Sequence, residues 1–179
     1  MSDSPDALTR ALLETEQHVA AAGWDQPVRL FALVRTSAVL AREPGLRDQL
    51  DSRTLRAAEA DPEHLIAIEQ EGLPHTSHLE SILGQLAWGP DVDGVALVVE
   101  RVIVPPEAER ELPPRPDDAV DYLAAHPGRE DVRLAVATLR TGQRQCGVRQ
   151  RRHDEPASVA VGPDLVPGLV AALAATLQA

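Results

Sequence analysis

The alternation of hydrophobic and polar positions predicts a chain that mixes helices with strands. Near the N-terminus, Leu8, Leu12 and Val19 recur at helical spacing and predict an amphipathic helix over residues 5–22. A second apolar stripe predicts a helix over residues 164–178. Between them, apolar runs of strand length alternate with shorter helical segments. Strands are expected at 29–35, 63–69, 94–104, 131–140, 143–151 and 158–161, and inner helical segments at 36–41, 46–60, 77–86 and 117–125.

The predicted strands differ in how deeply we expect them to be buried in the sheet. Residues 94–104 are β-branched and nearly all apolar in their first half, so we expect a central strand. Residues 29–35 carry apolar side chains on both faces, which indicates a strand covered on both sides. Residues 131–140 and 143–151 are joined by a tight turn and predict a hairpin. The prediction is therefore an α+β fold: a mostly antiparallel or mixed sheet of about five to six strands, flanked by N- and C-terminal amphipathic helices.

The length of 179 residues fits one domain, so we expect residues 1–179 to fold as a unit. Residues 105–116, PPEAERELPPRP, are Pro-rich and charged and predict an exposed loop. The acidic N-terminal stretch does not resemble a signal peptide, and no apolar run approaches the ~20 residues that cross a bilayer. With its single cysteine, the sequence indicates a cytoplasmic protein without membrane insertion.

A formal net charge of −11 changes the expected partners. An acidic surface repels phosphate backbones, so nucleic-acid binding is not expected. All 17 basic residues are arginine, and the chain contains neither lysine nor asparagine. Because the codons of both missing residues are rich in adenine, the composition indicates the GC-rich genome of an actinobacterium. Arginine then stands at positions where other proteins would use lysine, so its frequency says little about function.

The stretch QRQCGVRQRRHD combines the single cysteine, Cys146, with a possible base, His153. Strand alternation places Cys146 with Val148 on an apolar face and puts His153 out of phase. We therefore expect Cys146 to be a core residue and not a nucleophile. The neighbouring arginines are expected to lie on a solvated sheet face or to pair with acids of the same chain.

Scarce aromatic residues and carboxylates at strand ends supply the candidate site. Trp24 and Trp88 each follow a predicted helix and are the preferred pocket markers. Glu69 ends an apolar strand, where partial burial would raise its pKa as a general acid or base requires, although charges at strand ends are usually solvated. The sequence predicts no catalytic residue, metal ligand or cofactor with a recognisable motif. The candidate binding residues are Trp24, Phe31, Glu69, Glu71, Trp88, Glu100 and Arg101.

These features leave three functions open. The first is a non-enzymatic binding, adaptor or chaperone-like protein that holds a partner chain at a sheet face or groove and forms a homodimer. Its element order is loosely similar to that of small secretion-chaperone-like folds. The second is a small hydrolase or isomerase that uses Glu69, Glu71 or Glu100 with a histidine. The third is a metal-binding protein that uses His75 and His78, although a zinc site needs further ligands.

Whole segments of the chain also resemble a known family. The phrases GWDQPVRLFALVRT, IEQEGLP, LAWGPDVDGVALVVER, DVRLAVATLRTG and GPDLVPGLVAALAATL are similar to a family of uncharacterised actinobacterial proteins. The resemblance covers most of the chain from about residue 20 onward. Arg101 and the pair Pro105-Pro106 fit the family pattern. Because the family has no established activity, the resemblance implies no role for any residue.

Overall fold

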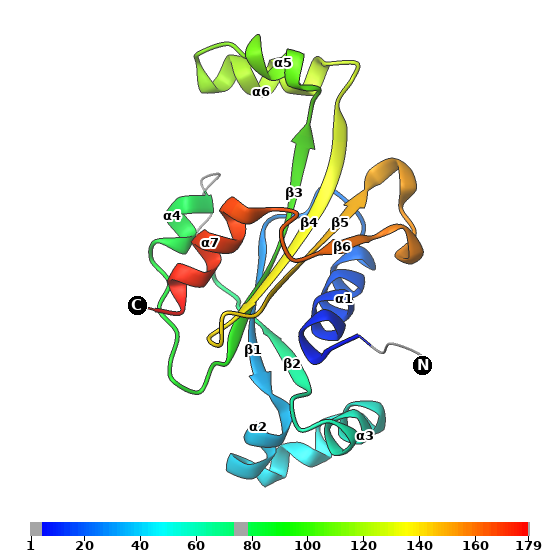
Figure 1. Cartoon of the computed structure of the whole chain (residues 1–179), viewed down its shortest axis with the longest axis vertical. Coiled ribbons are helices and arrows are strands. Elements are labelled where there is room, and N and C mark those ends of the chain that lie inside the picture. Colours follow the sequence, from blue (N-terminus) through cyan, green and yellow to red (C-terminus); the bar gives the residue numbers. More distant parts are fainter. Residues whose placement is uncertain (1–4, 74–78, 179) are drawn as a thin grey trace.

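The computed structural model describes residues 5–73 and 79–178 and places a six-stranded antiparallel sheet between helices (Figure 1). Neighbouring strands follow the order β2-β1-β3-β4-β5-β6, and every pair is antiparallel. The α+β prediction is therefore confirmed, with the sheet fully antiparallel. The strands are β1 (Arg29–Arg35), β2 (Leu65–Glu69), β3 (Gly94–Ile103), β4 (Glu130–Leu139), β5 (Arg144–Gln150) and β6 (Ala160–Gly162).

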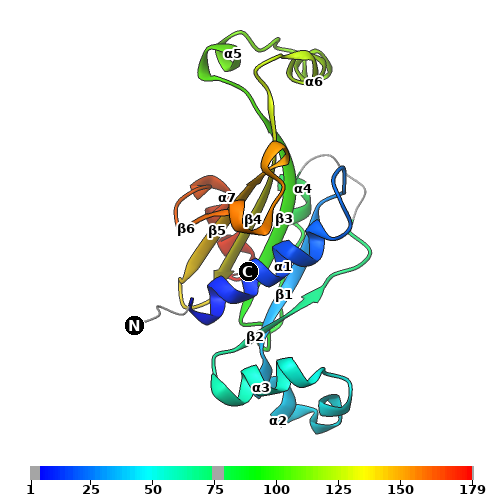
Figure 2. The same cartoon turned by 90° about the vertical axis from the view of Figure 1, so that its right-hand side faces the viewer.

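Helices cover both faces of the sheet (Figures 1 and 2). Helix α1 (Ala7–Ala20) lies on one face, and α4 (Leu79–Leu83) and α7 (Pro167–Thr176) lie on the other. The predicted flanking by terminal helices is thus confirmed. The other helical segments are α2 (Thr36–Arg42), η1 (Pro44–Asp48), α3 (Ser52–Ala60), α5 (Pro106–Arg110), α6 (Pro116–Ala125), η2 (Arg151–His153) and η3 (Pro156–Ser158).

The core has two layers because alternate side chains of each central strand point to opposite faces. Val95 and Leu97 of β3 pack in the layer beneath α7, where Leu173 is fully buried. Ala96 and Val98 pack in the layer beneath α1. Strand β1 is buried along both faces, as its two-sided apolar pattern predicts.

The hairpin of β4 and β5 confirms the predicted turn. Gly142 has φ of +93°, a left-handed conformation that glycine adopts without a Cβ penalty. Cys146 is fully buried in the layer beneath α7, opposite Val136, as strand alternation predicts. Its environment is that of a core side chain, which agrees with the structural interpretation of this cysteine.

Several predicted boundaries move. Helix α1 begins at Ala7, two residues later than predicted, because the Asp6 carboxylate accepts the Thr9 N–H at 2.7 Å and caps the helix. The helical region predicted at 46–60 divides into η1 and α3, with Asp51 as the N-cap of α3. Residues 105–116 are not a loop throughout, because they contain α5. The predicted helix start at Ser77 lies outside the described residues.

Two helical insertions extend from opposite ends of the sheet (Figures 1 and 2). The lobe, residues 36–60, joins β1 to β2 and contains α2, η1 and α3. The arm, residues 104–129, joins β3 to β4 and contains α5 and α6. Among the described helices, none is long and apolar enough to cross a membrane.

Candidate functional site

Two adjoining pockets lie along α1, where this helix faces β2 and the lobe. The first has a volume of about 540 Å³ and includes the N-terminal end of α1. The second has a volume of about 490 Å³ and includes the following turns of the helix and part of α3. Leu65 of β2 lines both pockets, so the two are neighbours. We call the two together the α1 groove.

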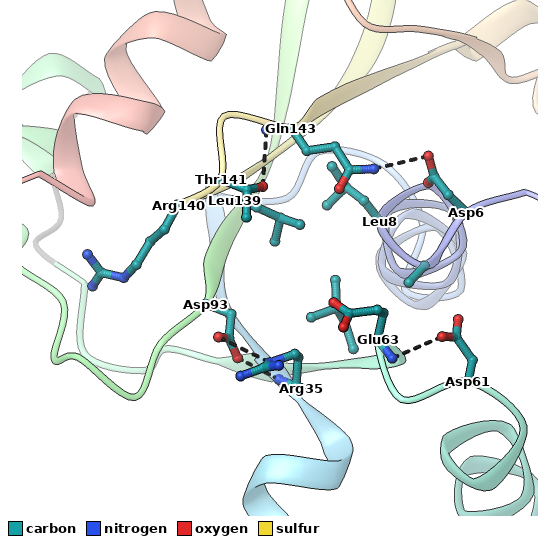
Figure 3. A pocket seen from close by; sticks show the side chains of 12 residues that line it. Asp6, Leu8, Arg35, Asp61, Glu63, Asp93, Leu139, Arg140, Thr141 and Gln143 are labelled. Atoms are coloured by element: carbon teal, nitrogen blue, oxygen red, sulfur yellow. Dashed lines mark hydrogen bonds and ion pairs between the residues drawn. The ribbon is translucent and has the colours of Figure 1, made fainter.

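The first pocket combines an aliphatic floor with an acidic rim (Figure 3). Its apolar part comes from α1, β2 and the end of β4. Its carboxylates come from the start of α1, the connection between α3 and β2, and the residue that precedes β3. The floor contains Leu8, Leu65 and Leu139, and the rim contains Asp6, Asp61, Glu63 and Asp93.

Backbone N–H groups hold several of these rim carboxylates in place. Asp93 accepts the Arg35 N–H at 2.8 Å and lies 3.6 Å from the Arg35 guanidinium. Asp61 accepts the Glu63 N–H at 2.9 Å. Glu63 itself is exposed, and its carboxylate has no ion pair among the described residues. Among the described residues, two rim carboxylates, Asp6 and Glu63, have no arginine partner, so a ligand can approach them without displacing an arginine.

Arg140 lines the first pocket, but its guanidinium group binds backbone carbonyl oxygens outside the acidic rim. Its guanidinium donates to the carbonyl oxygens of Val92 at 2.7 Å, Gly89 at 3.0 Å and Leu177 at 2.5 Å. Figure 3 shows this guanidinium pointing away from the rim carboxylates. Arg140 therefore ties the end of α7 to the connection before β3 and leaves the pocket acidic.

The second pocket is lined by Phe31, two histidines and further carboxylates. His64 is buried, and its Nδ1 lies 2.8 Å from the Thr36 hydroxyl. Glu69 accepts two hydrogen bonds from Arg29, at 3.0 and 2.5 Å. The pocket thus offers aliphatic and aromatic surface beside carboxylates that are already fixed in direction.

An ion pair beside the first pocket links α1 to the end of α3. Arg10 follows Leu8 of the first pocket and precedes Ala11 of the second along α1. Its guanidinium donates to Asp61 at 2.8 Å, which links α1 to the end of α3. The Arg10 Nε–H is buried and has no hydrogen-bond partner among the described residues.

The groove carboxylates with resolved pKa shifts are stabilised in their charged form. The Thr9 backbone N–H lowers the pKa of Asp6, and the Thr54 backbone N–H lowers the pKa of Asp51. Hydrogen bonds from Arg29 lower the pKa of Glu69. The prediction that burial raises the pKa of Glu69 is therefore wrong, because Arg29 outweighs desolvation. These groups favour holding a cation over proton transfer at neutral pH.

The structure brings only part of the predicted site together. Phe31 and Glu69 line the second pocket and are partners across β1 and β2. Glu71 is exposed beyond β2 and lines neither pocket of the groove. Glu100 lines neither pocket, because it belongs to a separate cluster near the end of α1. The three candidate carboxylates do not converge in the groove.

Trp24 and Glu100 belong to a buried charge cluster on the α1 face of the sheet. Glu100 accepts the backbone N–H groups of Asp25 and Gln26, both at 2.8 Å. Trp24 stacks over the guanidinium of Arg133, with 4.3 Å between the Arg133 Cζ and the ring centroid. Trp24 therefore closes the cluster and does not line the groove.

Two arginines of this cluster are buried with one glutamate. Arg149 donates to both oxygens of Glu16 at 2.6 Å, and Arg133 Nη1 lies 3.9 Å from Glu16. The Arg133 Nε and Nη1 groups have no hydrogen-bond partner among the described residues. The Trp24 indole and then Arg149 lower the pKa of Asp154, although the indole N–H does not reach full hydrogen-bond geometry. Arg149 thus pairs with acids of the same chain, which confirms one of the two predictions for the arginines near Cys146. The other prediction, a solvated sheet face, is wrong for Arg149 because this residue is buried.

The remaining candidates lie elsewhere. The Trp88 indole N–H donates to the Thr176 hydroxyl at 3.0 Å on the α7 face, so Trp24 and Trp88 share no pocket. Arg101 is exposed near the end of β3. His75 and His78 lie outside the described residues. Within residues 5–73 and 79–178, no group of three or more histidine, cysteine or acidic residues could hold a metal ion.

The rim of the first pocket is not among the residues predicted from the sequence. Asp61, Glu63 and Asp93 come just before strands, and a carboxylate in that position marks the end of a sheet. That signal was present in the sequence. Which strand ends meet the start of α1, however, depends on the strand order, which the pattern does not determine.

Fold and site together define an α+β protein with an acidic, aliphatic groove between its N-terminal helix and an edge of the sheet. The chain belongs to the PPA1309-like protein family, whose model matches residues 8–178. This confirms the resemblance to a family of no established activity. Searches of curated proteins and of solved structures found no match.

Proposed function

We propose that the protein is a non-enzymatic binding protein, which holds an extended basic and aliphatic segment of a partner chain in the α1 groove. The observation that carries the proposal is the groove itself, in which ionised carboxylates surround an aliphatic floor. Leu65 belongs to that floor and lines both pockets. Aliphatic side chains of a partner would pack there, while its cations would face the rim.

The charge of the rim selects the class of partner. A cation near the unpaired carboxylate of Glu63 gains Coulomb energy, since pairs near a protein surface interact at an effective dielectric of about 20. Asp6 and Asp51 are held in the charged form by backbone N–H groups. The same carboxylates would repel an anionic segment, so the groove would select positively charged partners over negatively charged ones.

The size of the groove fits a short peptide. Both pockets fall within the ~300–1,000 Å³ range of ligand pockets. Helix α1 has 14 residues and a length of about 21 Å, which equals about six residues of extended chain.

Two finer parts of the proposal concern assembly and location. Self-association is supported by β2 and β6, which form the edges of the sheet and are templates for pairing with another strand. Light scattering at several concentrations tests for the homodimer. A cytoplasmic location is supported by the single cysteine, which is buried and unpaired.

A peptide titration followed by NMR tests the proposed function. The probe is a nine-residue peptide of alternating arginine and leucine, and the control replaces each arginine by aspartate. We expect the basic peptide to shift the amide signals of Leu65, Thr141 and Gln143, and we expect no shift with the acidic peptide. Equal shifts with both peptides, or shifts confined to residues outside the groove, would contradict the proposal.

A further inference from the structure

The arm contains a helix that the rest of the described structure covers only in part, with Ala119, Tyr122 and Leu123 half-buried. Helix α6 has ten residues, and none of them is buried. Isolated helices shorter than ~12–15 residues are marginal in water, so a helix of this length depends on packing against something else. Figures 1 and 2 both show α5 and α6 beyond the end of the sheet, away from α1 and α7.

Exposed apolar side chains are concentrated in and next to the arm. Val120 of α6 is 65% exposed, the largest value among the exposed large hydrophobic residues of the described chain. Val102 and Ile103, at the end of β3, and Leu112, between α5 and α6, are also exposed. The four belong to the arm and to the strand end that carries it, whereas Val104 and Ala108 form its small buried part.

The charge of the arm identifies what would cover it. Residues 104–129 contain six carboxylates and three arginines. A second copy of the chain would bring the same acidic excess to the contact, and like charges in a contact oppose association. A partner with basic side chains around an aliphatic patch would complement both the charge and the exposed apolar residues.

We propose that the arm is a docking surface for a basic, aliphatic helix of a partner protein, separate from the α1 groove. The arm and the lobe lie at opposite ends of the sheet (Figure 1), and no residue of the arm lines the groove. The protein would therefore bind two segments at once, as an adaptor does. Linking two such contacts raises the overall affinity without a new contact at either site.

Matched variants and one probe test this proposal. The probe is an 18-residue helical peptide with leucine at helical spacing and lysine elsewhere, and its affinity is measured by isothermal titration calorimetry. The arm variant is Val120→Glu, and the control is Leu165→Glu, an exposed apolar position outside the arm that is 46% exposed. Both variants add one negative charge, and circular dichroism checks that each remains folded.

We expect Val120→Glu to weaken binding of the peptide at least tenfold, because it places a charge in the apolar contact, and Leu165→Glu to change it less than twofold. The groove variant Glu63→Arg should bind the helical peptide as tightly as wild type. This result distinguishes a failure of the arm proposal from a failure of the groove proposal. Equal affinities for Val120→Glu and Leu165→Glu would overturn the proposal. So would a concentration-dependent dimer that Val120→Glu abolishes, because the occupant would then be a second copy.

Discussion

At the scale of single residues, the buried cluster beneath Trp24 is the feature that most affects stability. Glu16 is 1% exposed and pairs with both Arg133 and Arg149, which also pair with the less buried Glu100 and Asp154. Breaking a buried ion pair from one side leaves an uncompensated charge in a medium of low polarity. Glu16 therefore joins α1 to β4 and β5, and through them it holds one wall of the groove.

We expect Glu16→Gln to lower the free energy of unfolding by about 3–5 kcal/mol, because it leaves two buried guanidinium groups without their shared carboxylate. Urea denaturation measures the change. The control is Glu14→Gln on the exposed side of the same helix, for which we expect a change within about 0.5 kcal/mol. Similar midpoints for the two variants would show that the cluster contributes little.

A second residue-scale prediction concerns pH. Arg29 lowers the pKa of Glu69 in the folded state, so the unfolded state binds the proton more readily. The stability contributed by this pair is present above the unfolded pKa of about 4.3 and is lost as pH falls through the lower folded pKa. Wild type should exceed Glu69→Gln in stability at pH 7, and the gap should close in acid. A gap that is independent of pH would contradict this assignment.

The sequence predicts some of these residues and not others, for a physical reason. Cys146 could be placed in the core because strand alternation is a local rule. The partner of Arg149 could not be found, since Glu16 lies 133 positions away and becomes its neighbour only after folding. Trp24 was predicted to mark a pocket, whereas its contact with Arg133 depends on distant packing that the local pattern does not reveal.

At the scale of elements, hydrophobic periodicity predicts each strand to within a few residues. The ends of helices depend instead on individual side chains, as Asp6 and Asp51 show by capping α1 and α3. The short helix α5 was missed because Pro106 reads as a breaker, although proline is well tolerated in the first turn of a helix. Element types are thus more predictable than their ends.

The contact between β3 and β4 allows a prediction at this scale. A Cβ on Gly94 would lie 2.4 Å from the carbonyl oxygen of Thr138, so alanine would push the paired strands apart. We expect Gly94→Ala to destabilise the fold by about 1–3 kcal/mol in thermal or urea unfolding. Gly89→Ala is the control, because a Cβ at Gly89 meets no atom within 4 Å. Equal stability of these two variants would contradict the close approach.

At the scale of the whole molecule, a sheet between two layers of helices carries two helical insertions and a groove. The fold class follows from the pattern of elements and from the hairpin. The groove does not follow, because it forms where the start of α1, the β4–β5 turn and the lobe meet. Asp6 and Gln143 illustrate this, as their side chains bond at 3.2 Å across 137 positions. Position in the sequence gives no sign of that contact.

The most direct test of the central claim compares two variants with the same change in charge. Glu63→Arg alters the groove rim, whereas Glu71→Arg alters an exposed site that lines neither pocket. The affinity of each for the nine-residue arginine–leucine peptide is measured by calorimetry. The account predicts at least a tenfold loss for Glu63→Arg and less than a twofold loss for Glu71→Arg. Equal losses would mean that only overall charge attracts the peptide, and would contradict binding in the α1 groove.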